Sequence, residues 1–309
     1  MSTNSPFVIV PALSAVAIKY RQSNLIADLV MPRVKVDKQE FIDLSDRMAE
    51  WITPPDTQVG RSSATNQLSN SMQDPVYLAT VNQGLDEPVP NQDTLNSPSE
   101  SALMRATQRV MGFVALRREI RTAAIASNSA NFGYTAVLSG TSMWSDYVNS
   151  NPLYDLLTYL DQPFMRPNRL TMGRAVWTVL SQHPKLVAVA GASAGARRIT
   201  RQELANLLEI DEIDEIIVGD GWINTAAKGK TPVKSRIWGK FCAGTYTGDV
   251  SNADNGMWGY TAQFGDRIAG TIIDPDIGLR GGVRVRAGES VREVVTAKEF
   301  GFLLTNVVA

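Results

Sequence analysis

The chain has 309 residues, of which 44% are hydrophobic and 20% charged, a soluble globular composition whose length predicts two domains. The 30 lysines and arginines oppose 31 acidic residues, so the net charge of −1 gives no overall electrostatic reason to expect binding to nucleic acid or to a membrane. The single cysteine, Cys242, excludes an intrachain disulfide and a cysteine-based zinc cluster, and it indicates a reducing compartment, the cytoplasm.

The first segment, Pro6 to Ala17, is apolar, but it is too short to span a bilayer and lacks the basic start of a signal peptide. We expect an arm that packs on another surface. From Met31 to about Leu95 the chain is rich in Asp, Gln, Asn, Pro and Ser, with alternation over 33–37, an apolar run within 73–82 and turn residues between them. This pattern predicts a protruding hairpin.

A lone hairpin is at best marginally stable in water, and long structureless loops are uncommon in compact domains. We therefore expect the segment Met31 to Leu95 to lie on a partner molecule. The alternative is a disordered linker between two domains, which the regular strand pattern disfavours.

The strongest helix signal lies at Ser97 to Ala130. Ser97 and Glu100 can form a capping box, and Pro98 suits the first helical position. Apolar residues then recur at helical spacing, namely Leu103, Ala106, Val110, Phe113, Val114, Ile120 and Ala124. Such a helix would be far longer than the mean helix of about 11–12 residues. It is either a long core helix of an ordinary α/β protein or the rod of a thin, flat body.

Five arginines lie largely off that apolar stripe, namely Arg105, Arg109, Arg117, Arg118 and Arg121. They either form a solvated face of the helix or pair with carboxylates or phosphates of a partner. The sequence leaves both interpretations open. Because the last three crowd the far end of a helix whose other face is apolar, our hypothesis is that at least one of them lies in a subunit interface.

The C-terminal half alternates between helix and strand patterns. The predicted helices follow Asn151-Pro152 and cover Gly173–Gln182 and Thr200–Leu208, the last with a capping box formed by Thr200 and Glu203. The predicted strands are Leu170–Met172, Leu186–Ala190, Ile216–Val218 and Ile237–Thr247, and the tail Ile268–Ala309 is rich in strand signals.

Motifs for catalysis are scarce. The only histidine, His183, precedes a proline at a helix end, where it is better explained as a cap or a packed side chain than as a base, and no G-x-S-x-G frames a serine. The glycine-rich stretches Gly191–Gly195 and Gly229–Thr231 lack the spacing of nucleotide-binding loops. Two acidic groups without calcium-loop spacing are better explained as solvated turns than as cation sites: Asp211, Glu212, Asp214 and Glu215, and the pair Asp274 and Asp276.

The order of these elements and several short sequence segments resemble those of the major capsid proteins of tailed bacteriophages with the HK97 fold. Ile26 to Val34 resembles the entry into the extended loop of that family, and Thr57–Arg61 and Gly84–Pro90 resemble its outward and returning limbs. The helix Ser97–Ala130 corresponds in position to the spine helix, and the stretch from Gly288 through Leu304 resembles the closing strands.

The resemblance implies an α+β fold with an N-terminal arm, an extended β-hairpin loop, a long spine helix in a peripheral domain and an α/β axial domain. The implied division is 1–30 for the arm, 31–95 for the extended loop, 96–150 for the peripheral domain with the spine helix, 151–265 for the axial domain and 266–309 for closing strands that return to the peripheral domain. The loop residues Pro54, Pro55 and Arg61 become candidates for subunit contacts.

The resemblance also implies a structural protein, not an enzyme, with no cofactor and no metal. Identical subunits would form the hexamers and pentamers of an icosahedral shell around packaged double-stranded DNA, without sequence-specific binding and without a membrane. The implied partners are a portal protein, a decoration protein and a scaffold made separately, because the chain reaches its arm soon after Met1. Assembly would occur in the host cytoplasm, and the protein would end in the virion.

Some members of this family crosslink a lysine of the extended loop to an asparagine of a neighbour. Here the loop offers only Lys35 and Lys38, both near its base, so we expect no crosslink. Two alternatives remain: an encapsulin-like compartment shell, which shares the fold and differs in its cargo, and an α/β enzyme, which the missing motifs disfavour.

Overall fold

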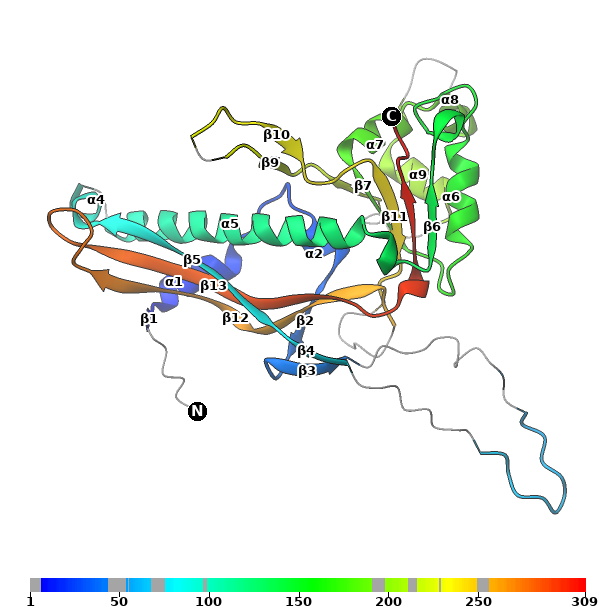
Figure 1. Cartoon of the computed structure of the whole chain (residues 1–309), viewed down its shortest axis with the longest axis horizontal. Helices are drawn as coiled ribbons and strands as arrows, with labels where there is room; N and C mark the ends of the chain where they lie inside the picture. Colours follow the sequence, from blue (N-terminus) through cyan, green and yellow to red (C-terminus); the bar gives the residue numbers. More distant parts are fainter. Residues whose placement is uncertain are drawn as a thin grey trace.

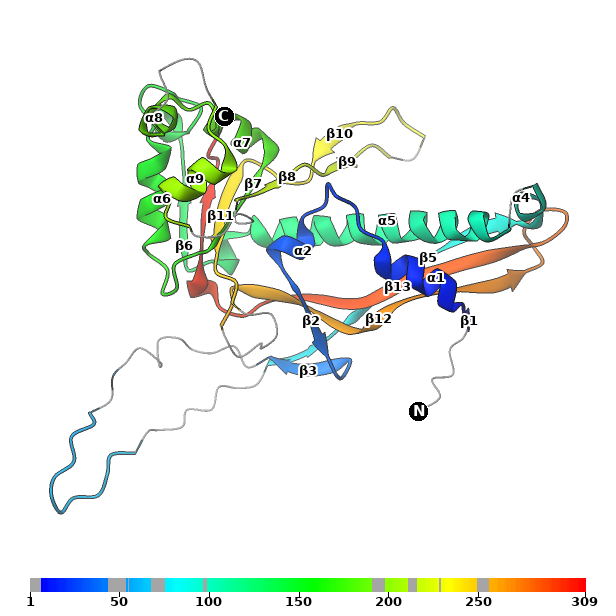
Figure 2. The same cartoon turned by 180° about the vertical axis from the view of Figure 1, so that it is seen from behind.

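The structure is a computed structural model. One of its two five-stranded sheets lies along a long helix, and the other lies at one end of that helix (Figure 1). The structure describes residues 7–43, 54, 56–67, 76–96, 99–190, 198–210, 216–227, 229–248 and 256–309. One end of the elongated body holds most of the short helices, and the other end is the tip of a long β-hairpin (Figures 1 and 2).

Helix α5 (Ser99–Ala126) confirms the predicted long helix. Ser97 and Pro98, two residues of the predicted N-terminal cap, lie outside the described residues. The helix ends at Ala126 rather than at Ala130, because the Asn131 side chain donates to the carbonyl of Ile125 at 3.0 Å and a 3-10 turn, η1 (Ser129–Asn131), follows. A side chain that bonds one of the last carbonyls in this way ends a helix without a glycine.

The first sheet lies along α5. Its strand order is β1 (Val8–Ile9), β12 (Gly259–Asp274), β13 (Gly282–Val295) and β5 (Val81–Pro90), and β2 (Arg33–Val36) pairs parallel to β12. Helix α1 (Pro11–Lys19) packs between this sheet and α5, where Leu13 and Ala17 meet Val110 and Val114. The predicted arm is therefore a short strand and a helix that cover the rod.

The extended loop starts as a small hairpin. Strand β3 (Glu40–Asp43) is antiparallel to β4 (Val76–Ala79), with Phe41 opposite Leu78. Beyond it, residues 56–67 extend far from the rest of the molecule (Figures 1 and 2). The apolar run within 73–82 was expected to pair with residues 33–37. Its strand β4 pairs with β3 instead, and residues 33–36 pair with β12, so the loop has a second attachment to the body.

The second sheet forms the helical end. Its order is β6 (Tyr134–Val137), β14 (Gly301–Thr305), β11 (Phe241–Thr245), β7 (Arg169–Gly173) and β8 (Ile216–Gly219). One face packs on α6 (Pro152–Leu160), α7 (Arg174–Leu180), α8 (Pro184–Val189) and α9 (Arg201–Leu207). The other face meets the end of α5 and the turn helix α2 (Ala27–Val30) in a core that contains Trp238 and Trp258.

The remaining elements are short. They are α4 (Asn91–Asn96), the 3-10 turns η2 (Gly140–Ser142) and η5 (Lys298–Phe300), and the hairpin strands β9 (Trp222–Asn224) and β10 (Lys234–Arg236). The capping box predicted at Thr200 is present, with the Thr200 hydroxyl accepting from the Glu203 amide at 3.2 Å and the Glu203 carboxylate accepting from the Thr200 amide at 2.8 Å.

One prediction about an element is corrected by the structure. Leu186–Ala190 was expected to be a strand, but Leu186–Val189 belongs to α8, which begins with Pro184 at a position where a helix needs no N–H. A short apolar run does not distinguish strand from helix by its periodicity.

The closing strands lie in both sheets, because β13 belongs to the first sheet and β14 to the second. The return of the tail to the peripheral domain stays a prediction.

Candidate assembly surfaces

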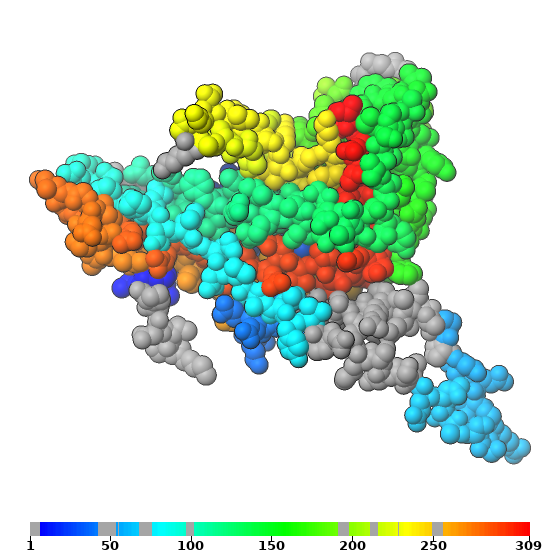
Figure 3. All heavy atoms as spheres, viewed as in Figure 1, coloured from blue at the N-terminus to red at the C-terminus, as the bar shows by residue number. Residues whose placement is uncertain are grey.

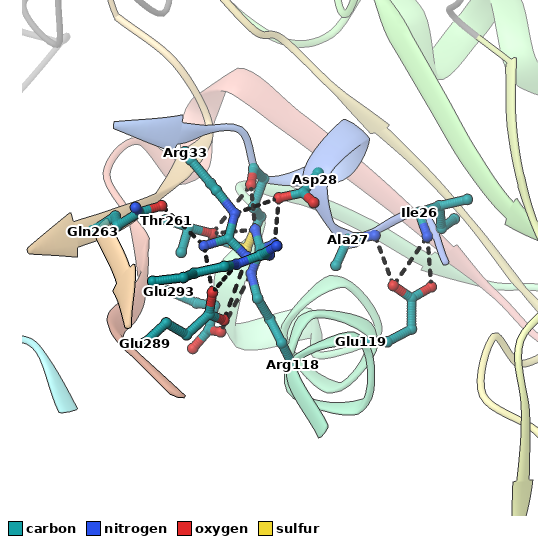
Figure 4. A network of polar contacts seen from close by, with 12 residues as sticks. Ile26, Ala27, Asp28, Arg33, Arg118, Glu119, Thr261, Gln263, Glu289 and Glu293 are labelled. Atoms are coloured by element: carbon teal, nitrogen blue, oxygen red, sulfur yellow. Dashed lines mark hydrogen bonds and ion pairs between the residues drawn. The ribbon is translucent and has the colours of Figure 1, made fainter. Parts of the chain in front are cut away.

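The five arginines of α5 do not share one environment. Arg118 is only 2% exposed; its Nη1 pairs with Asp28, and its Nη2 donates to the Met31 carbonyl at 3.0 Å and to the Thr261 hydroxyl at 2.9 Å (Figure 4). Arg118 therefore does not lie on a solvated face of the helix, and a subunit-interface role for it stays a prediction. The N-terminal arm and β12 pack on this part of the helix, and the spacing of apolar residues along the helix could not predict that they do.

The other four arginines are more accessible. Arg121 donates to Glu293 at 2.9 Å and is half-buried, while Arg109 pairs with Glu87 at 3.2 Å and is exposed. Arg105 and Arg117 are exposed as well. A subunit-interface role for Arg105, Arg109, Arg117 and Arg121 stays a prediction.

Arg118 belongs to a buried ionic cluster that joins the entry of the extended loop to the body (Figure 4). Arg33 on β2 pairs with Glu289 on β13 at 2.8 Å and with Asp28 at 2.7 Å, and Arg267 on β12 pairs with the same Glu289 at 2.9 Å. Burial alone would raise the pKa of the Glu289 carboxyl, but Arg33 and Arg267 outweigh it and lower that pKa. Likewise Arg118 and Arg33 outweigh burial at Asp28 and lower its pKa to about 2.

Glu119, the next residue on α5, fastens three parts of the chain. Its fully buried carboxylate accepts from the backbone amides of Ile26 at 3.0 Å and Ala27 at 2.7 Å, and from Trp238 Nε1 at 2.6 Å. Burial raises the pKa of this carboxyl. The arm, the long helix and the segment that leads into β11 of the second sheet therefore meet at one side chain.

Sequence reasoning missed this junction. Glu119 and its partner Ile26 are 93 positions apart, and Arg33 and Glu289 are 256 apart. The stretch Ile26–Val34 resembles the entry into the extended loop of the family, but that resemblance did not predict which contacts its side chains make. Within one sequence no local spacing connects such residues, so no signal could have found the pairs.

The tip of the extended loop is the first candidate assembly surface. Pro54 and Arg61 are exposed, as is every described residue from 56 to 67, and Pro55 lies outside the described residues. The limbs of the loop are held together by Asn66 Nδ2, which donates to the Asp56 carbonyl at 2.9 Å. Near the base, Lys35 pairs with Asp266 at 2.9 Å, and Lys38 is exposed.

A groove between α5 and β5 is the second candidate surface. It encloses about 380 Å³ and is lined mainly by Gln83, Leu85, Phe113, Leu116, Arg117 and Ile120. Leu85 is 49% exposed and Phe113 is 51% exposed. Phe113 was expected on the buried stripe of the helix, but β5 does not cover this position. An apolar groove of this kind is a candidate for a surface that a partner covers.

The third candidate surface is the tip of the β12–β13 hairpin with α4 beside it. Leu95, Ile273 and Leu279 are 72%, 86% and 96% exposed, and Figure 3 shows this tip at the opposite end from the short helices. The tip is well ordered by polar contacts: Arg284 pairs with Asp274 at 2.7 Å, and Asn91 Nδ2 donates to the Arg280 carbonyl at 2.9 Å. These aliphatic side chains are therefore presented on a fixed frame.

The candidate catalytic groups are structural where the chain is described. His183 is buried, its Nε2 lies 3.0 Å from Ser150 Oγ, and burial lowers its pKa. The acidic group at 211–215 and the stretch Gly191–Gly195 lie outside the described residues. Over the described ranges no group of three or more His, Cys, Asp or Glu side chains is placed to hold a metal, and none of the helices there is both long and apolar enough for a membrane crossing.

Comparisons with known proteins agree with this arrangement. No family model matches the chain. It is 41% identical to the major capsid protein of Pseudomonas phage JBD67 over 99% of both chains. A phage-related protein from Bordetella bronchiseptica superposes with a TM-score of 0.74 at 23% identity, over 97% of this chain and 98% of that one. The putative capsid protein of a prophage of E. coli CFT073 gives 0.57 at 13% identity, over 97% and 99%.

A long helix along one sheet, a helical end built on a second sheet and a projecting loop make up the HK97 fold. The chain belongs to the family of phage major capsid proteins. The predicted fold class and family are confirmed, and the protein is a structural subunit of an icosahedral phage head rather than an enzyme. The α/β enzyme alternative is wrong, and the family favours a phage head over an encapsulin-like compartment.

Proposed function

We propose that this subunit closes its shell chiefly by laying its extended loop on a neighbouring subunit, and that the shell encloses double-stranded DNA. The observation that carries the proposal is the exposure of every described residue at 54 and 56–67. A segment that projects so far from its own core gains little stability from its own subunit. Contact with a neighbour explains why the chain keeps it.

The groove between α5 and β5 is the surface that we assign to the arriving loop. Its apolar residues Leu85 and Phe113 are half-exposed, and Arg117 at its rim can pair with a carboxylate such as Asp56. On the loop, Val59 is 46% exposed and supplies an apolar side chain. The interface role of Arg117 thus rests on the same contact.

The finer partners and boundaries are part of the same proposal. Membership of the family supports hexamers and pentamers as building units, with a separate scaffold, a portal and a decoration protein as partners and the host cytoplasm as the place of assembly. We keep the division into an arm, an extended loop, a peripheral part and an axial part, with β14 assigned to the axial sheet and β5 to the peripheral one, as their pairing supports.

The test is removal of the loop tip. A variant that lacks residues 56–67 should keep the thermal unfolding temperature of the parent subunit, because these residues contribute little to the core, yet it should form few closed particles in negative-stain microscopy. The matched control is Ser62→Ala, which changes one exposed side chain of the tip and keeps the length of the loop. Closed shells of normal yield from the deletion variant would contradict the proposal.

A further inference from the structure

The β9–β10 hairpin is a projecting element that the assembly surfaces do not use. Asn224 lies opposite Lys234, and Trp222 lies opposite Arg236. Its turn is fixed by the Asn224 side chain, which accepts from the amides of Ala226 at 3.1 Å and Val233 at 2.9 Å. In Figures 1 and 2 the hairpin leaves the second sheet and extends over α5, on the side of the helix that faces away from the first sheet.

The hairpin is strongly basic. Between positions 219 and 237 the sequence has four basic residues, Lys228, Lys230, Lys234 and Arg236, against one acidic residue, Asp220. Lys230 and Lys234 are exposed. Asp220 is shared by two cations, Arg236 at 3.3 Å and Arg174 at 3.6 Å, so it cannot neutralise the lysines as well.

The base of the hairpin holds one of these cations in a fixed orientation. The Arg236 guanidinium lies 4.0 Å from the centroid of the Trp222 ring, and the ring itself is half-exposed. Stacking and the ion pair with Asp220 reduce the freedom of the arginine before any partner arrives. The two exposed lysines, by contrast, are flexible and suit a partner whose charges do not occupy fixed positions.

A polyanion with regularly repeated charges fits this arrangement. Double-stranded DNA carries one phosphate charge per about 1.7 Å of its axis, and its major groove, about 12 Å wide, admits a two-stranded β-ribbon. We propose that the β9–β10 hairpin contacts the backbone phosphates of the enclosed DNA through Lys230, Lys234 and Arg236, without reading its sequence. This inference rests on the proposed function, since it requires DNA inside the shell.

The test compares two variants with the same change of net charge. Lys230→Gln/Lys234→Gln removes the proposed contacts, and Lys19→Gln/Lys38→Gln removes two exposed lysines elsewhere on the subunit. Binding of the purified subunit to a fluorescent DNA duplex of mixed sequence is measured by anisotropy over a series of salt concentrations. Because each neutralised phosphate adds about 0.9 to the slope of log affinity against log salt, the slope should fall by about 1.8 in the first variant and stay at the parent value in the second.

An unchanged slope in Lys230→Gln/Lys234→Gln, or an equal fall in both variants, would overturn the inference. Negative-stain microscopy of the same samples separates it from the shell proposal. Normal shells with a reduced salt slope support the DNA contact. Loss of shells with an unchanged salt slope would assign the hairpin to a contact with a neighbouring subunit and would overturn the DNA inference. Failure of the loop-deletion test does not affect the salt dependence of DNA binding, so the two proposals can fail separately.

Discussion

At the scale of single residues, Glu119 is the side chain that contributes most to the junction between the N-terminal arm, α5 and the segment around Trp238. Glu119→Ala would leave the amides of Ile26 and Ala27 and the Trp238 indole without an acceptor in a buried site. An unsatisfied buried donor costs about 1–3 kcal/mol, so we expect the free energy of unfolding to fall by about 3 kcal/mol or more. Thermal or urea unfolding of the subunit measures this loss.

Two matched variants sharpen that measurement. Glu119→Gln keeps one acceptor oxygen and should lose less than Glu119→Ala. Gln108→Ala, at an exposed position of the same helix, should stay within about ±0.5 kcal/mol of the parent. A Glu119→Ala subunit as stable as the Gln108→Ala subunit would show that the three donors find other partners.

Asp28 predicts how the subunit responds to acid. Its pKa is lowered from 3.8 to about 2 in the folded chain, so its pairs with Arg118 and Arg33 stabilise the fold above pH 4 and are lost as the pH falls through about 2. Because the Asp28 side chain is half-exposed, solvent screens these pairs, and we expect Asp28→Asn to cost about 1 kcal/mol at neutral pH. Unfolding measured between pH 2 and 7 should show a flatter acid limb in the variant; parallel curves would contradict the assignment.

At the scale of elements, the helix caps show what a sequence can specify alone. The capping box of α9 involves Thr200 and Glu203, three positions apart, and the structure has both of its hydrogen bonds. We expect Thr200→Ala to lower the free energy of unfolding by about 1 kcal/mol. Thr141→Ala, at an exposed position of η2, is the control and should change little. Equal unfolding temperatures for both variants would show that the cap contributes nothing.

Elements whose signals are local could be predicted, and those decided by tertiary contacts could not. The long helix and the Thr200 cap follow from residues within one or two turns. The helix over Leu186–Val189 could not be distinguished from a strand, because its apolar run has no period of its own. Arg118 was expected off the buried stripe of α5 but is buried, because the arm covers that side of the helix. Phe113 was expected on the buried stripe but is exposed, because β5 leaves its side of the helix open.

At the scale of the whole molecule, the subunit has candidate assembly surfaces at both ends and along its length. The extended loop projects sideways from the junction, and the β12–β13 tip lies opposite the helical end (Figures 1 and 3). A closed shell of identical subunits needs self-complementary contacts at its two-fold axes and head-to-tail contacts that close into rings at its other axes. Since Glu119, Arg118 and Glu289 fasten the loop entry to the rod and to both sheets, these surfaces keep fixed positions relative to one another.

The exposed tip gives the most direct test of assembly at this scale. Ile273 at the end of β12 and Leu279 in the following turn are almost fully exposed, and the Asp274–Arg284 pair holds this tip. Ile273→Ser/Leu279→Ser should therefore leave the free energy of unfolding within about ±0.5 kcal/mol of the parent. If copies of this tip meet at a symmetry axis, the same variant removes apolar contacts that recur at every copy, and the yield of closed particles should fall several-fold. Leu279→Met keeps an apolar side chain of similar volume and should assemble as the parent does. Particle yield by sedimentation, with unfolding temperature as the companion measurement, decides the point: normal yield from the double serine variant would show that the tip faces solvent in the shell.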